Sequence, residues 1–211
     1  MAEVHVEGKP EQVHVKNSGR LKELLISGAP VILETSRNPM RKTKYSLIAV
    51  KKNGIWVNVD SQVPNAVVYE ALMSGQIKEF SPVSLLKREV IRGNSRFDLY
   101  FEGSGRRGFI EVKGVTLEQN GVAMFPDAPT LRGARHIREL ADAVRDGFAG
   151  AVFFLVQRSD CRIFSPNDQM DKPFADALRQ AAQEGVQVIA YDAAVTEDEI
   201  VIGRPLEVRL M

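Results

Sequence analysis

The chain has 211 residues, of which 44% are hydrophobic and 26% are charged, so it can bury the core of one large domain or two small ones and is not expected to be disordered. Its longest apolar run, over 147–156, has about half the length of a bilayer-spanning helix, and its N-terminus lacks the basic and apolar regions of a secretory signal. The single cysteine, Cys161, excludes an internal disulfide. We therefore expect a cytoplasmic globular protein with no membrane partner.

The basic residues are unevenly distributed, although the formal net charge is only +1. Residues 37–52 (RNPMRKTKYSLIAVKK) carry six positive charges and no acid, whereas residues 195–200 are acidic. Two interpretations of the basic run stay open. It is either a solvated edge or a surface that contacts a polyanion, in which case Arg41 and Lys42 are candidate contacts.

The first third of the chain predicts short strands separated by turns. The clearest signal is a hairpin over 44–60 around Asn53-Gly54, the sequence signature of a type I′ turn. Further strands are expected over 3–8, 11–17 and 30–36, with a brief helical turn over 18–28. Such a set favours a compact β-barrel, which can be of the oligonucleotide-binding (OB) or the SH3-like kind.

From about residue 64 onward, helices alternate with strands. We expect helices over 65–75, 130–147 and 174–185, a strand emerging from 78–92, a hairpin over 95–115, and buried strands over 149–157 and 186–191. This order predicts an α/β (α+β) sandwich with a mixed sheet. The boundary near 61–66 divides the chain into an OB-like domain, 1–63, and an α/β domain, 64–211.

The hairpin over 95–115 carries charged residues where a sheet should bury apolar ones. Because side chains alternate along a strand, Glu111 and Lys113 share one face, and Asp98 on the neighbouring strand can lie beside them. Two carboxylates and one ammonium leave a net negative charge that a divalent cation would neutralise. The set has the D…(E/D)-x-K layout of a metal-dependent phosphodiesterase. The alternative is a surface salt bridge between Glu111 and Lys113.

A further acid often completes such a site from the preceding helix. Glu70 is the candidate, with Glu89 on the first strand as a competitor, while an ordinary solvated helix acid remains the alternative for Glu70. A zinc site is not supported, because the histidines and Cys161 show no ligand spacing. Dinucleotide-binding loops, P-loops and nucleophile elbows are also absent, which leaves a small-molecule enzyme of sugar metabolism with little support.

The stretch FPDAPTLRGARH (125–136) places basic residues in the first turns of a helix. Thr130 is a candidate N-cap, and Arg132, Arg135 and His136 follow it where the helix dipole favours anions. The functional interpretation is a phosphate clamp beside the metal site. Solvent-facing helix residues, or a structural role for His136, are the alternatives.

Seven stretches, distributed over nearly the whole chain, carry a family resemblance: FIEVKGVTL, MFPDAPTLRGARHIREL, AVFFLVQRSD, GVQVIAYDA, HVKNSGRLKELLISGAPVIL, RKTKYSLIAV and EVIRGNSRFDLYF. They resemble the sugar fermentation stimulation protein (SfsA) family. The resemblance implies an OB-like N-terminal domain followed by a PD-(D/E)xK nuclease-like domain. Asp98, Glu111 and Lys113 match the nuclease motif and Glu70 its helical acid. Asp127, in FPDAPT, and Gln157, after a core strand, are further site candidates. Family members usually carry a segment before the equivalent of EVHVEG, which bears on whether the small barrel closes.

The sequence thus leads to two hypotheses. The first is a sequence-nonspecific DNA-binding protein with a Mg²⁺- or Mn²⁺-dependent nuclease-like site and, as the resemblance implies, a link to the regulation of sugar (maltose) metabolism. The second is a non-catalytic DNA-binding regulator derived from a nuclease fold. RNA is not excluded as a partner, and the oligomeric state, a homodimer included, stays open.

Overall fold

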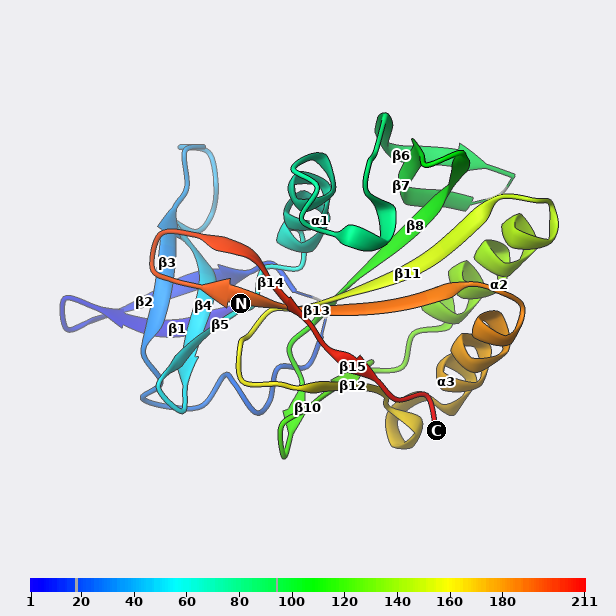
Figure 1. The fold of residues 1–211 in the computed structure, drawn as a ribbon. Coiled ribbons are helices and arrows are strands. Elements are labelled where there is room, and N and C mark those ends of the chain that lie inside the picture. Colours follow the sequence, from blue (N-terminus) through cyan, green and yellow to red (C-terminus); the bar gives the residue numbers. More distant parts are fainter. Residues whose placement is uncertain (18, 94) are drawn as a thin grey trace.

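The computed structural model, which describes residues 1–17, 19–93 and 95–211, begins with a five-stranded sheet (Figure 1). In chain order its strands are β1 (Ala2–Val6), β2 (Lys9–Val15), β3 (Val31–Thr35), β4 (Tyr45–Lys52) and β5 (Ile55–Asn58). The predicted hairpin turn is confirmed, since Asn53 and Gly54 have φ of 50° and 84°. The helical turn expected over 18–28 is a single turn, in which the carbonyl of Leu21 accepts from the N–H groups of Leu24 and Leu25. Ser18 lies outside the described residues.

The expected small β-barrel does not close among the described strands, which form an open sheet. Among the described strands the order is β1-β2-β4-β3, and β5 also pairs with β4. Ser46 and Leu47 of β4 pair with β2, whereas the residues from Ala49 to Lys52 pair with β5. One edge of β4 is therefore divided between β2 and β5. The strands β1 and β3 lie at the two ends of the order, and no described pairing joins them, so the sheet is open.

The rest of the chain forms a larger α/β unit. Its elements are α1 (Val63–Met73), η1 (Lys78–Phe80), β6 (Leu85–Arg92), β7 (Ser95–Gly103), β8 (Arg106–Val115), β9 (Glu118–Gln119), β10 (Val122–Phe125), α2 (Leu131–Arg145), β11 (Ala149–Val156), β12 (Ile163–Pro166), α3 (Asp168–Gln183), β13 (Gln187–Val195), β14 (Ile200–Pro205) and β15 (Glu207–Val208). Six strands form one sheet in the order β14-β13-β11-β8-β7-β6, and four short strands form another, β15-β12-β10-β9. In the large sheet β8, β11 and β13 are parallel, while β6, β7 and β14 are antiparallel to their neighbours. The predicted mixed sheet is confirmed.

Helices cover both faces of the large sheet, with α1 on one side and α2 and α3 on the other (Figure 1). The apolar stripe of α2 packs on the sheet through Ile137 and Leu140, which are fully buried. The strand β11 lies in the centre and is buried on both faces, as its unbroken apolar run predicts. Among the described residues, no helix combines the length and apolarity needed to cross a membrane.

Candidate metal and nucleic-acid site

The charged residues of the β7–β8 hairpin meet at one cavity of about 270 Å³. Ile110 and Val112 of β8 pack in the core beneath α1, so the alternating residues Glu111 and Lys113 face the side of α2. Asp98 reaches the same cavity from β7. Arg96 of β7 also lines it, and the lining residues outside the hairpin include Ser61, Asn65, Glu89, Thr130, Arg132 and His136. The structure therefore brings together the three residues that the hairpin pattern singled out.

Glu111 is buried, and its two oxygens have unequal surroundings. Oε1 accepts a hydrogen bond from Nζ of Lys113 at 2.6 Å and lies 2.7 Å from Nδ1 of His136. Oε2 is buried and has no partner among the described residues. Because Nε of Arg132 donates to Nε2 of His136 at 3.4 Å, the imidazole carries its proton on Nδ1 and donates it to Glu111.

Asp98 is held by two donors. The side-chain amide of Asn65 donates to Oδ1 and the backbone N–H of Val112 to Oδ2, each at 2.8 Å. Burial, followed by the negative charge of Glu111, raises the pKa of Asp98 above its usual value. Burial also opposes ionisation of Glu111, but the hydrogen bond from His136 and the charge of Lys113 outweigh it and lower the pKa of Glu111. The pair therefore carries negative charge that the protein neutralises only in part.

The structure does not bring Glu70 to this cavity. Glu70 is exposed on α1, whereas Asn65 is the α1 residue that lines the cavity. Residues five apart on an α-helix project about 140° apart, so the two point in different directions. Glu89 lines the cavity instead, and its φ of 53° places it in the left-handed region, between the two β6–β7 pairs that flank Asp98. Sequence reasoning missed Asn65, because an uncharged residue at the start of a helix gives no pattern signal.

The carboxylates suit a hard divalent cation, although the described residues form no ready cluster of three His, Cys, Asp or Glu ligands. The orphaned Oε2 of Glu111 is a buried acceptor that a cation would satisfy. Two carboxylates completed by water are a donor set that Mg²⁺ and Mn²⁺ accept.

The start of α2 supplies the predicted basic residues in different environments. The hydroxyl of Thr130 accepts from the N–H of Gly133 at 3.0 Å, which confirms the predicted N-cap. Arg132 lines the cavity, whereas Arg135 is exposed, and its Nε lies 3.9 Å from Oε1 of Glu139. His136 is only 5% exposed and contacts Glu111, so its position matches the structural alternative better than a direct phosphate contact.

Two other candidates join the N-terminal sheet to the α/β unit. Gln157 is buried, and its amide donates to Oδ1 of Asn58 at 2.7 Å and to the carbonyl of Asp60 at 3.1 Å. Asp127 accepts from the N–H of Arg20 at 3.0 Å. Both also line a second cavity, of about 380 Å³, which shares Lys113 with the first. These residues hold the two parts of the chain beside the site.

Arg41 and Lys42 lie in the loop between β3 and β4 and line a separate pocket that also includes Lys16 and Gln62. The guanidinium of Arg41 donates to the hydroxyl of Ser46 at 2.9 Å, so it also anchors its own loop. Lys42 is exposed. Neither residue lines the carboxylate cavity.

Comparisons with known proteins agree with this architecture. Residues 1–59 match the family model described as the SfsA N-terminal OB domain, and residues 62–199 match the sugar fermentation stimulation protein RE domain. Two relatives called sugar fermentation stimulation protein homolog, from Alkaliphilus oremlandii and Clostridium tetani, are each 49% identical over 99% of this chain and 91% of their own length. A solved structure described as Pyrococcus furiosus SfsA in complex with Ca²⁺ superposes with a TM-score of 0.90 at 28% identity, covering 98% of this chain and 89% of the other. The chain therefore belongs to the sugar fermentation stimulation protein (SfsA) family.

Proposed function

We propose that this chain binds DNA and hydrolyses phosphodiester bonds at the carboxylate cavity, as a PD-(D/E)xK-type nuclease that depends on Mg²⁺ or Mn²⁺. The observation that carries the proposal is the meeting of Asp98, Glu111 and Lys113 at one cavity, with one Glu111 oxygen buried and unpaired among the described residues. DNA binding would be the route by which the protein influences sugar metabolism, maltose use included.

Asp98 and Glu111 would hold the metal, with Glu89 at the rim of the same cavity. The ion would polarise the phosphate and lower the pKa of a bound water. The Pyrococcus furiosus relative is described as a complex with Ca²⁺, another cation that prefers oxygen ligands, and this supports the proposal.

Lys113 and Arg132 would act on the substrate phosphate. The Lys113 ammonium contacts Glu111 and its side chain is 18% exposed, so it can turn toward an anion in the cavity. There it would orient water or stabilise charge that develops on the phosphate. Arg132 would bind a neighbouring phosphate oxygen, while His136 keeps Glu111 in place.

The direct test is a cleavage and retention assay with labelled single- and double-stranded DNA and RNA. Incubation with Mg²⁺ or Mn²⁺ should give shorter products, and EDTA should suppress cleavage while leaving a retained complex. Failure to cleave any of these substrates with either metal would overturn the catalytic part of the proposal.

A non-catalytic DNA-binding regulator is the second candidate. Both oxygens of Asp98 already accept hydrogen bonds within the protein, and this favours a carboxylate that organises the fold. Retention of DNA with no cleavage in the same assay would select this candidate.

The basic run of the N-terminal sheet gives a separate prediction. If residues 37–52 contact nucleic acid, the double variant Arg41→Gln/Lys42→Gln should reduce the slope of log K against log salt by about 1.5 units, because each lost phosphate contact removes about 0.7–0.9. Fluorescence anisotropy across a salt series measures the slope. Lys172→Gln/Arg209→Gln, which removes two exposed charges elsewhere, is the matched control. An unchanged slope in the test variant would move the contact surface to Arg132 and Arg135.

A further inference from the structure

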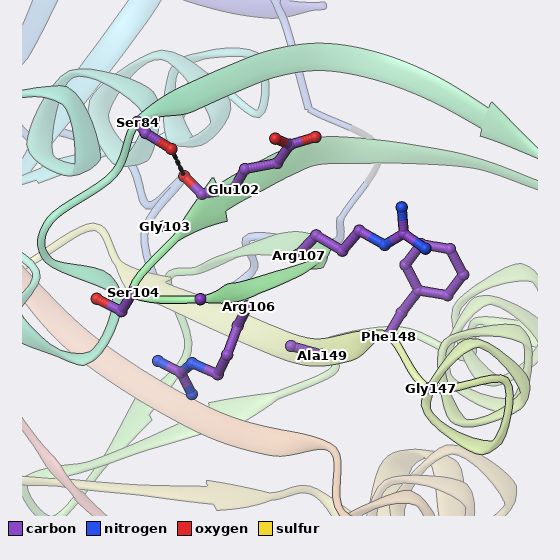
Figure 2. Close-up of a pocket in the computed structure, with 10 residues that line it drawn as sticks. Ser84, Glu102, Gly103, Ser104, Arg106, Arg107, Gly147, Phe148 and Ala149 are labelled. Atoms are coloured by element: carbon purple, nitrogen blue, oxygen red, sulfur yellow. Dashed lines mark hydrogen bonds between the residues drawn. The ribbon is translucent and has the colours of Figure 1, made fainter.

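An open pocket of about 740 Å³ lies at the turn between β7 and β8 (Figure 2). The turn precedes β8, whereas Glu111 and Lys113 of the carboxylate cavity lie toward the other end of that strand. The walls of the pocket come from the hairpin turn and from the segment that connects α2 to β11. Two adjacent arginines follow the turn, and their side chains project from opposite faces of the strand (Figure 2). Arg106 donates to the carbonyl of Glu79, and Arg107 lies against Phe148.

The guanidinium of Arg107 is held by an aromatic ring and not by a carboxylate. Its centre lies 5.0 Å from the centroid of Phe148, and the guanidinium of Arg92 lies 5.2 Å from the same ring. Such a contact uses the flat face of the guanidinium and leaves its N–H edge free to donate. Arg107 forms no ion pair with any residue that the structure describes, and its cross-strand neighbour Glu102 accepts from the hydroxyl of Tyr100. The result is an oriented positive charge with unused donors.

Arg107 shares a strand face with the carboxylate site. Residues 107, 111 and 113 lie on the same side of β8, and the six residue steps from Arg107 to Lys113 span about 20 Å. Arg92 pairs with Ser95 across β6 and β7, and its guanidinium lies near the rings of Phe109 and Phe148. Arg92 and Arg107 therefore lie at the same aromatic ring, on the side of the sheet that also carries Glu111.

The carboxylates along this path already have partners. Glu89 lies 3.6 Å from Arg96, Asp146 pairs with Arg92, and Glu139 accepts from the hydroxyl of Ser95. Arginines thus offset the charge of Glu89 and Asp146, whereas Arg107 forms no ion pair with a described residue and has Glu102 as its cross-strand neighbour.

We propose that Arg107, placed against Phe148 and next to Arg92, forms a distal subsite for a backbone phosphate of the nucleic acid that occupies the carboxylate cavity. The planar, forked donors of arginine match the geometry of a phosphate oxygen pair. At about 3.4 Å per base pair, the separation of about 20 Å corresponds to about six base pairs of duplex. The inference rests on the proposed function for the identity of the polymer.

The test compares Arg107→Ala with wild type on fluorescein-labelled DNA in Ca²⁺, which keeps hydrolysis slow. The probes are single strands of 2 and 12 nucleotides and hairpin duplexes with stems of 4 and 12 base pairs. For the long probes, we expect affinity at 0.1 M salt to fall about three- to tenfold and the salt slope to fall by about 0.7–0.9 units. For the short probes, which cannot reach both sites, we expect no change.

Two further variants distinguish the orientation of Arg107 from a general loss of positive charge. Phe148→Leu keeps both arginines but removes the ring that orients them, so affinity for the long probes should fall by less than in Arg107→Ala. Arg138→Ala removes an exposed arginine from the groove between α2 and α3 and should bind all probes as wild type does. Circular dichroism melts confirm that each variant is folded.

The outcomes are distinct. Wild-type behaviour of Arg107→Ala on long probes, equal losses on short and long probes, or an equal loss in Arg138→Ala would overturn the subsite and leave the proposed function standing. If wild type binds none of the probes, the proposed function and the subsite both fall. A parallel titration with inorganic pyrophosphate tests a free anion. Pyrophosphate binding that Arg107→Ala abolishes, with DNA binding unchanged, would assign the pocket to a free phosphate compound and overturn the nucleic-acid assignment.

Discussion

Asp98→Asn should lower metal-dependent cleavage by about 100-fold or more, because it removes one of the two charges that would hold the cation. The substitution keeps the local geometry. The remaining oxygen of the amide can accept from the N–H of Val112, and its NH₂ group can donate to Asn65 once that side chain is turned. DNA retention without metal should be unchanged or stronger, since one negative charge facing phosphates has gone. Product formation and isothermal titration with Mn²⁺ measure the two effects.

Lys113→Ala is the matched comparison within the same cavity. It should suppress turnover, but leave Mn²⁺ affinity nearly unchanged, because Lys113 would act on water or on the phosphate and not as a ligand. Comparing the Asp98 and Lys113 variants therefore distinguishes loss of metal binding from loss of the catalytic step. If both variants bind metal and DNA as wild type does and wild type shows no cleavage, the residues form a structural ion cluster.

The hairpin and the second helix could be predicted because their side chains follow one period without interruption. The alternation over 95–115 places Glu111 and Lys113 on one strand face, as the structure has them. The spacing of Arg132 and His136 predicts a shared face on α2, and their side chains are in contact. The sequence did not reveal that this face turns toward Glu111, because a helical period defines a stripe without saying what covers it.

The prediction that Glu70 of α1 joins the site was wrong because the hydrophobic pattern of α1 does not define how the helix is rotated. Three consecutive apolar residues, Ala66, Val67 and Val68, give α1 no narrow stripe, so its rotation on the sheet is not defined by sequence. That rotation decides whether Asn65 or Glu70 reaches the cavity. The open N-terminal sheet has a similar cause, because β4 divides one edge between two partners and no local signal in its sequence marks the division.

A buried arginine beside Gln157 was also missed, since basic residues are expected at the surface. Arg158 is fully buried, although its guanidinium is charged. It donates to both oxygens of Asp160, at 2.6 and 2.7 Å, to Glu118 at 3.3 Å, and to the carbonyl of Thr116 at 3.1 Å. Thr116 lines the cavity that adjoins Lys113, so this cluster fixes the chain just after β8.

Arg158→Met should lower the free energy of unfolding by about 2–4 kcal/mol, because it leaves Asp160, Glu118 and a buried carbonyl without their donor. At about 2–4 °C per kcal/mol for a chain of this size, the melting temperature should fall by roughly 5–15 °C. Arg179→Met, which removes a more exposed arginine paired with Asp168, is the control and should lower the free energy of unfolding by less than about 1 kcal/mol.

The hydrogen bonds from Arg158 hold the pKa of Asp160 below its usual value, so the stabilisation is present at neutral pH and is lost as pH falls through that lowered pKa. The difference between wild type and Arg158→Met should therefore narrow below about pH 4. A melting temperature shift no larger than that of the control, at neutral pH, would show that water replaces the arginine and that the cluster contributes little to the fold.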